Sequence, residues 1–320
     1  MSAPTVPPDS NFKERPESEK ILDKGFVGLT TAFAIAIGLI LLLIALVIFI
    51  RALPAIQTFG LGFLTSSAWN PVRGREEFGV LPVIYGTLVS SLIALLIAVP
   101  LGIGSAIFLS EDFIPLNART ILVFLVQLLA AIPSVVYGLW GIFVLIPILR
   151  PLGNWLNANF SWIPLFSTPL GGPGMLPAGV ILAIMILPII IAISRDSLAA
   201  LPPDLRQASL GLGATRWETI FRVLIPAAFS GIVGGIMLAL GRALGETMAV
   251  AMVIGNSSII SPSLLAPGYT IPAVLANTFP EAFEKIHIGA LMYLALVLFV
   301  ITLAVNSVAA LLVQFINRNR

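Results

Sequence analysis

Six apolar runs, each long enough to cross a lipid bilayer, constrain this chain more than any other feature. A helix needs about 20 residues to cross a hydrocarbon core of about 30 Å. Because the runs are continuous rather than alternating, they predict membrane-spanning helices and not barrel strands. Only 10% of the residues are charged, too few to coat a soluble protein of this size. The predicted spans are residues 26–50, 81–109, 120–149, 175–193, 226–254 and 288–315.

The predicted spans divide the chain into a small terminal part and a large core. In order, we expect a polar tail (1–25), the first span (26–50), an aqueous segment (51–80), a core of five spans (81–316) with a charged loop (195–226), and a short tail (317–320). The head of the first tail is rich in Pro, Ser, Glu and Lys, which predicts disorder. Residues 17–24 are expected to form a short helix leading into the membrane.

Proline and glycine predict local features of the spans. Pro133 lies near the centre of the third span and predicts a kink. Gly86, Gly102 and Gly104 in the second span predict close approach of a neighbouring helix. The single histidine, His287, borders an apolar run and is expected to be solvated or interfacial.

Lys and Arg are distributed unequally between the two sides of the membrane. Six spans place both termini on one side. Eleven Lys and Arg residues lie on that side and five on the other. The positive-inside rule therefore predicts that both termini and the charged loop are cytoplasmic.

The longest charged interruption of the apolar sequence is LPPDLRQASLGLGATRWETIFRVLIP, residues 201–226. Its two consecutive prolines suit the first turn of a helix, where no N–H donor is needed. Gly211 and Gly213 are expected to end that helix, and residues 216–223 to form a second one. The pattern predicts a folded helix–turn–helix outside the membrane, with an ordinary solvated loop as the alternative.

The fifth span carries two charges within GRALGETMAV. Arg242 and Glu246 are four residues apart, so they would share one face of a helix, with Arg242 near mid-span. An unpaired charge there costs at least about 2.5–3.5 kcal/mol, so the pair must face protein or water. One interpretation is a structural ion pair. The other is a pathway for an oxyanion, because a guanidinium offers a planar fork of donors and Gly241 and Gly245 leave space around it.

The third span adds three polar side chains, Gln127, Ser134 and Tyr137, as candidates for the same pathway. Ser134 and Tyr137 are three residues apart and can share a helical face, where both could donate to an anion. Hydrogen bonding to their own helix or to a neighbour is an equally good explanation.

Several kinds of chemistry lack the residues they need. The chain has no cysteine, and none of its four lysines follows a glycine, so no phosphate-binding loop for ATP occurs. The G-x-S-x-G and H-E-x-x-H patterns are also absent. Glu246 is the one carboxylate predicted inside the membrane, so acid–base catalysis there lacks a second group. We expect no enzyme activity, no metal and no cofactor.

The charged loop resembles the cytoplasmic loop of ABC importer permeases, whose pattern is E-A-A-x3-G-x9-I-x-L-P. The residues on this pattern are Gln207, Ala208, Ser209, Gly213, Val223, Ile225 and Pro226. Gln207 departs from the family Glu, as Ser209, Val223 and Ile225 depart from Ala, Ile and Leu. Segments 78–111, 131–143 and 239–256 are similar to the PstC-type permeases of bacterial phosphate-specific ABC importers.

The resemblance implies an all-α integral membrane protein of the bacterial inner membrane, with the type I ABC importer permease fold and a cytoplasmic coupling helix. It implies a heterodimer with a second permease, two copies of an ATPase and a periplasmic phosphate-binding protein. Phosphate would meet Arg242, held by Glu246. The residues implied in coupling to the ATPase are Arg206, Gln207, Ala208, Ser209, Gly211, Gly213, Ala214, Arg216 and Trp217.

Three other functions compete with phosphate import. A permease for molybdate or sulfate would use the same coupling loop. An ion-driven secondary transporter would need no ATPase and commonly shows inverted repeats, of which the sequence offers no convincing example. An intramembrane enzyme is disfavoured because paired catalytic groups are missing.

Overall fold

The computed structural model describes residues 17–70, 72 and 75–318. The predicted disorder at the head of the N-terminal tail lies outside these residues. The contacts divide the chain into two units, residues 1–50 and 51–320. In the first unit, α1 (Glu17–Phe59) runs without interruption from the predicted short helix through the first span. Its last residues, from Arg51, belong to the second unit.

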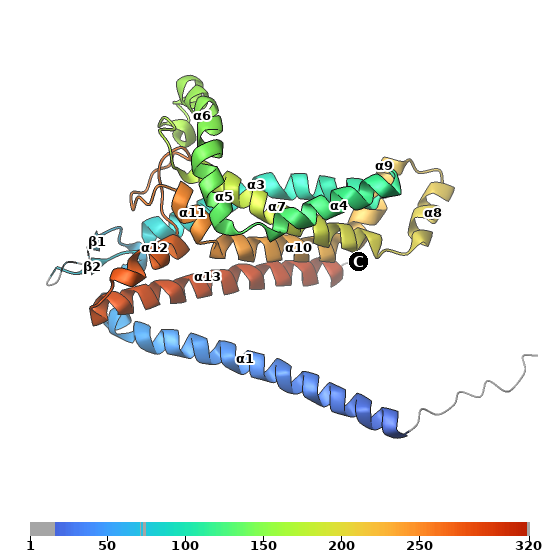
Figure 1. Ribbon diagram of the computed structural model, residues 1–320, viewed down its shortest axis with the longest axis horizontal. Helices are drawn as coiled ribbons and strands as arrows, with labels where there is room; N and C mark the ends of the chain where they lie inside the picture. Colours follow the sequence, from blue (N-terminus) through green and yellow to red (C-terminus); the bar gives the residue numbers. More distant parts are fainter. Residues whose placement is uncertain (1–16, 71, 73–74, 319–320) are drawn as a thin grey trace, which may run out of the picture. The chain divides into compact units, whose positions relative to one another are not determined.

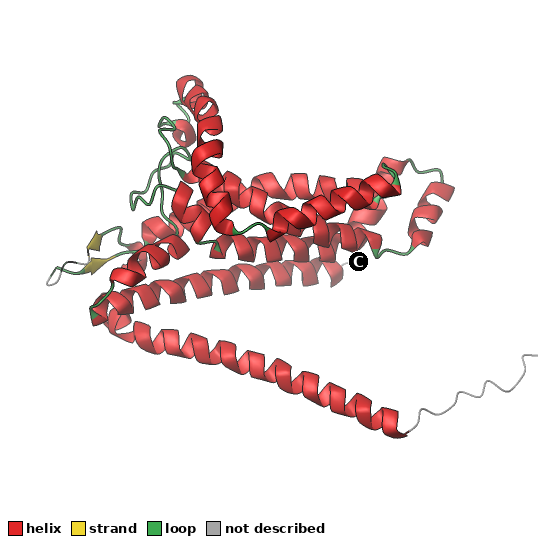
Figure 2. Ribbon diagram, in the orientation of Figure 1, coloured by secondary structure: helices red, strands yellow, loops and turns green. Residues whose placement is uncertain are grey.

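The second unit is built almost entirely of helices, with one short hairpin (Figure 2). Its elements are α2 (Gly62–Thr65), β1 (Trp69–Asn70), β2 (Glu77–Phe78), α3 (Leu81–Ser110), α4 (Leu116–Ala131), α5 (Ser134–Trp140), α6 (Ile146–Phe160), α7 (Met175–Ala199), α8 (Pro203–Gly211), α9 (Arg216–Thr219), α10 (Ile225–Gly245), α11 (Met248–Val253), α12 (Ile271–Thr278) and α13 (Lys285–Arg318). The strands pair antiparallel, Trp69 opposite Phe78.

Six helical stretches of the described chain are long and apolar enough to cross a membrane. They are Leu22–Phe59, Leu81–Ser110, Ser134–Phe160, Met175–Ala199, Arg216–Gly245 and Lys285–Phe315. An all-α membrane protein with six spans was predicted, and the structure agrees in number. The boundaries of the third and fifth spans differ: the fifth, predicted at 226–254, is Arg216–Gly245.

The third predicted span, residues 120–149, is wrong because the chain breaks at Pro133 instead of kinking. α4 ends at Ala131, and Ile132 is extended (φ −67°, ψ 129°), as expected for a residue that precedes proline. α5 then continues through a π turn into α6. α4 and α6 point in different directions (Figure 1), so the spanning stretch begins after the proline.

The centre of the second unit is the contact between α3 and α7, with α10 packed against both. Small buried residues recur every fourth position along α3: Gly86, Ser90, Ala94, Ala98, Gly102 and Ala106. Such a stripe lets helix backbones approach closely. A Cβ on Gly102 would lie 2.6 Å from Cγ2 of Ile190 in α7. Gly104 has no such neighbour within 4 Å, so the close approach predicted for it does not occur.

The two ends of the helical core carry different elements (Figure 1). α8 and α9 lie at one end, and the β1–β2 hairpin, α6 and α12 at the other. His287, near the start of α13, is buried and stacks on Phe78 with 5.3 Å between ring centroids. The expectation that His287 is solvated is therefore wrong, because the hairpin covers it.

Candidate functional site

The charged loop, residues 201–226, is called the coupling loop from here on. Its first helix begins and ends where its prolines and glycines predicted. Pro202 precedes the first residue of α8, and α8 ends at Gly211. Gly213 adopts φ +88°, a left-handed conformation that costs a residue with a Cβ about 1–2 kcal/mol. The first helix of the predicted helix–turn–helix and its end are confirmed.

The second helix of the loop is not a separate element. α9 passes through a π turn, Ile220–Leu224, directly into α10, so the stretch from Arg216 to Gly245 is one continuous rod. Its start is fixed by a capping box: Thr215 Oγ1 accepts from the Glu218 N–H at 3.3 Å, and Glu218 Oε2 accepts from the Thr215 N–H at 2.8 Å. The second half of the loop is therefore continuous with α10.

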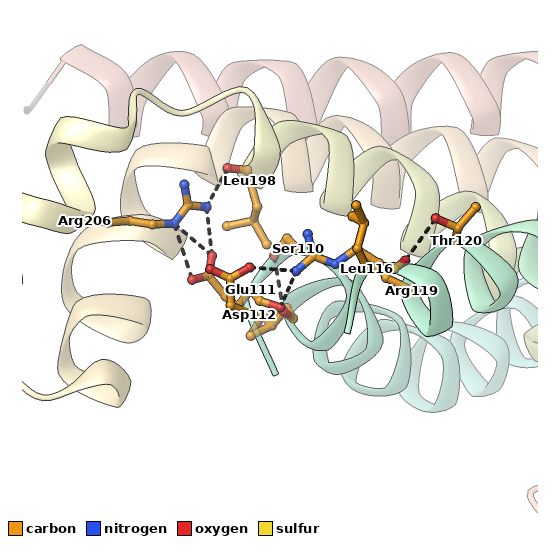
Figure 3. Close-up of polar contacts among 9 residues, drawn as sticks. Ser110, Glu111, Asp112, Leu116, Arg119, Thr120, Leu198 and Arg206 are labelled. Atoms are coloured by element: carbon orange, nitrogen blue, oxygen red, sulfur yellow. Dashed lines mark hydrogen bonds and ion pairs between the residues drawn. The ribbon is translucent and has the colours of Figure 1, made fainter. Parts of the chain in front are cut away.

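An ion pair connects the coupling helix to the end of α3 (Figure 3). Arg206 in α8 donates from Nη2 and Nε to Glu111 Oε1 at 2.8 and 3.1 Å. Its Nη2 also donates to the Leu198 carbonyl of α7 at 3.3 Å. Glu111 is only 8% exposed. Removing one partner of such a buried pair typically costs about 3–5 kcal/mol, because the other charge is left without compensation.

Arg119 extends this network to α4. Its Nη2 donates to the Glu111 carbonyl at 2.9 Å and to Asp112 Oδ1 at 3.0 Å. Sequence reasoning missed Glu111, which looked like part of an ordinary turn. The signal that could have revealed it is an acidic residue directly after a span, on the side where arginines gather.

The nine predicted coupling residues divide into an exposed and a half-buried group. The exposed ones are Gln207, Ala208, Gly211, Gly213, Arg216 and Trp217, and the half-buried ones are Arg206, Ser209 and Ala214. Ser209 Oγ lies 2.9 Å from Thr219 Oγ1, joining α8 to α9. Gln207 carries no charge, and the ion pair of this loop is made by its neighbour Arg206 instead.

Three aromatic side chains gather around α9: Trp217 from α9 itself, Phe221 from the π turn after it and Phe113 from the turn between α3 and α4. The Arg216 guanidinium carbon lies 4.0 Å from the ring centroid of Phe113. Trp217 also contacts Phe113, with 5.6 Å between centroids, and stacks on Phe221 at 5.9 Å. Trp217 is 56% exposed, so this cluster offers a partner both apolar area and a positive charge.

The two charged residues of the fifth span do not pair with each other. α10 ends at Gly245, and Glu246 is extended (φ −68°, ψ 125°), so Arg242 and Glu246 do not share one helical face. Glu246 Oε1 accepts from the Ala249 N–H at 3.4 Å, at the start of α11. Within the described chain, the side chain of Arg242 makes no hydrogen bond or ion pair. The expectation that Glu246 holds Arg242 is therefore wrong.

Arg242 instead lines an open pocket of about 600 Å³. The pocket is lined by Ile189, Gly234, Met237, Leu238, Gly241, Arg242 and Asn306, from α7, α10 and α13. A Cβ on Gly241 or Gly245 would meet nothing within 4 Å, as expected for glycines that leave space. The pocket combines a guanidinium and an amide with apolar walls, which is a composition that can bind a small anion.

The three polar candidates of the third span are separated by the break at Pro133. Tyr137 is buried in α5, and Ser134 begins the same helix half-buried. The Tyr137 hydroxyl donates to the Leu129 carbonyl at 2.8 Å. Gln127 lies in α4, exposed, and lines a different, small pocket with Arg195 and Asp196. None of the three lines the pocket of Arg242.

No metal site is evident in the part of the chain that the structure describes, since no three His, Cys, Asp or Glu residues gather there. Six helical stretches long and apolar enough to cross a membrane, together with a pocket lined by an arginine, are features of a membrane permease.

Comparison with known proteins narrows this class. Residues 98–320 match the family described as "Binding-protein-dependent transport system inner membrane component". The chain is 48% identical to the "Phosphate transport system permease protein PstC" of Mesorhizobium japonicum, over 90% of this chain and 89% of that protein. It is 41% identical to the protein of that name from Pasteurella multocida, over 93% of each.

The chain belongs to the family of binding-protein-dependent transport system inner membrane components. Among solved structures, the "MetNI methionine ABC transporter" in an inward-facing conformation matches with a TM-score of 0.52, covering 74% of this chain and 94% of that chain. Its sequence is 20% identical, so this likeness concerns the fold alone. The expected type I ABC importer permease fold and the resemblance to PstC-type permeases are confirmed.

Proposed function

We propose that this chain is the permease subunit of an ATP-driven importer of inorganic phosphate. The observation that carries the proposal is 40–48% identity, over most of the chain, to permeases named for phosphate transport. The chain lacks a phosphate-binding loop for ATP, so we assign ATP hydrolysis to a partner and no catalysis to this subunit.

Arg242 is the residue that we expect to meet the phosphate. Its guanidinium is exposed to an open pocket and makes no ion pair in the described chain. A charge facing lipid is costly, so the open side of this pocket must be covered by protein or filled with water. A second permease placed there would complete the wall of the pathway on its open side. Asn306 supplies an amide to the same pocket. Ser134 and Tyr137, in α5, stay candidates for another part of the pathway.

The coupling loop is the part that we expect to bind the ATPase. Its exposed residues include Gln207, Arg216 and Trp217, beside the strongly exposed Leu212. Because α9 and α10 form one rod, displacement of the loop would shift the helix that carries Arg242. This supports a transport cycle in which ATP-driven closure of two ATPase copies changes access to the pocket.

The proposal also places the complex in the membrane. With the loop and both termini in the cytoplasm, the β1–β2 hairpin, α6 and α12 would face the periplasm. There a phosphate-binding protein would deliver the anion. Residues 1–16, 319 and 320 carry some of the charges used for this orientation and lie outside the described residues.

Uptake by the reconstituted complex tests the proposal. The chain would be co-purified with its second permease and ATPase, placed in liposomes with the binding protein, and supplied with ATP and radioactive phosphate. We expect phosphate uptake that requires ATP and is not reduced by excess sulfate or molybdate. Uptake of those anions in place of phosphate would indicate a permease for another oxyanion. Uptake driven by an ion gradient without the ATPase would indicate a secondary transporter.

A further inference from the structure

We propose that Glu111 is the positioning residue through which movement of the coupling helix α8 reaches α3 and α4. The inference rests on the proposed function, because it assigns a task to a contact of the same loop. The backbone already joins α8 to α7 on one side and to α9 and α10 on the other. The ion pair with Arg206 adds a connection to a helix end that lies 95 residues away in sequence (Figure 3).

Few other polar contacts join α8 to the membrane helices. No residue of α8 is fully buried, and its half-buried members, Arg206 and Ser209, lie three positions apart and so on one face. Ser209 reaches Thr219 in the neighbouring α9. Within the described chain, the side-chain hydrogen bonds from α8 to α7 and to the end of α3 all come from Arg206.

Glu111 is fixed from the opposite side by α3 and α4. Its N–H donates to the Ile107 carbonyl at 3.0 Å, which continues the helix bonding of α3. Its carbonyl accepts from Arg119 of α4 at 2.9 Å. A pull of α8 on the carboxylate therefore acts on a backbone that is bonded to both helices.

The geometry of the pair makes it a firm connection. Two donors of Arg206 engage one buried carboxylate, and such two-point contacts hold direction as well as distance. Moving Arg206 away from Glu111 would leave the buried carboxylate without a compensating charge. An apolar contact would resist compression but would slide, whereas this pair resists movement both toward and away from α3.

Paired variants test this connection in the assembled complex. Glu111→Gln and Arg206→Gln each remove the ion pair, and Asp112→Asn is the matched control. Asp112 is the adjacent carboxylate, its side chain is 96% exposed, and it pairs with Arg119 rather than Arg206. The first readout is the number of phosphate ions taken up per ATP hydrolysed. We expect this number to fall at least about fivefold in both test variants, which is the lower end of typical coupling between sites. The control should keep the wild-type number.

A second readout does not depend on the transported substrate. Because the chain has no cysteine, spin labels can be attached at Asp204→Cys in α8 and Leu96→Cys in α3, both exposed. We expect ATP to leave the distance between the labels unchanged in the wild type and in Asp112→Asn. The distance should change or broaden when either partner of the ion pair is neutralised.

Wild-type uptake per ATP and wild-type label distances in both test variants would overturn the inference. If Glu111→Gln does not assemble, Arg206→Gln carries the test, since the Arg206 side chain is 26% exposed. If the wild-type complex transports no phosphate, the proposed function fails, and the label distances still decide whether Glu111 connects α8 to α3.

Discussion

The Tyr137 hydroxyl donates a hydrogen bond of 2.8 Å to the Leu129 carbonyl, across the break between α4 and α5. In an uninterrupted helix this carbonyl would accept from the N–H four residues later. That residue is Pro133, which has no N–H. The tyrosine therefore replaces the donor that the proline removes, and it holds the sharp turn at which α4 ends.

Tyr137→Phe should destabilise the protein without abolishing transport. The variant leaves a carbonyl in the turn without its best donor, and a lost hydrogen bond of this kind costs about 0.5–1.5 kcal/mol. Thermal unfolding of the purified complex would measure the loss. Tyr85→Phe, which removes a hydrogen bond of the same kind to the Ser261 carbonyl away from this turn, is the comparison. Complete loss of phosphate uptake in a stable Tyr137→Phe complex would show that the hydroxyl serves the substrate.

Replacing Arg242 should strongly lower transport, even when the positive charge is kept. Hydrogen bonds to charged groups contribute about 1.5–3 kcal/mol, so Arg242→Ala should lower phosphate uptake by about tenfold to a hundredfold. Arg242→Lys should recover little, because an ammonium lacks the planar fork. Arg150→Ala, in α6 and outside this pocket, is the control. Wild-type uptake by an assembled Arg242→Ala complex would contradict the assignment.

Glu246→Gln should be tolerated, because Glu246 accepts a backbone hydrogen bond from Ala249 and does not pair with Arg242. The amide oxygen of glutamine can accept the same bond. Initial rates of phosphate uptake would therefore stay close to wild type. A loss as large as that of Arg242→Ala would give the carboxylate a direct part in the pathway.

Gly102→Ala should destabilise the α3–α7 contact, whereas Gly104→Ala should not. The added Cβ at Gly102 would lie 2.6 Å from Ile190, which is fully buried and has no room to move. Overpacking of this kind typically costs about 1–3 kcal/mol. At Gly104 the Cβ meets nothing within 4 Å. Unfolding midpoints in detergent would compare the two variants, and equal midpoints would argue against the packing described.

Gly213→Ala should loosen the coupling loop, whereas Gly211→Ala should not. Of these two glycines, Gly213 is the one with a positive φ, at +88°, so an alanine there costs about 1–2 kcal/mol. Amide hydrogen exchange along α8 should then accelerate by about 5–30-fold. Gly211 ends the helix with open space around it, so alanine fits there. Unchanged exchange in Gly213→Ala would show that the turn is not strained.

The spans and the coupling helix could be predicted because they depend on local properties of the chain. Apolar length decides where a helix can cross the membrane, and the prolines and glycines around α8 decide its ends through their own backbone preferences. The shared spacing of the loop also pointed to the family.

Only the tertiary structure decided which charges meet. Glu111 and Arg206 lie 95 positions apart, and they come together because α3 packs along α7, which leads into α8. Arg242 and Glu246 are close in sequence, yet the helix ends between them and their charges do not pair. The physical reason is that hydrophobic length acts within one segment, whereas an ion pair depends on how segments pack and where a helix stops.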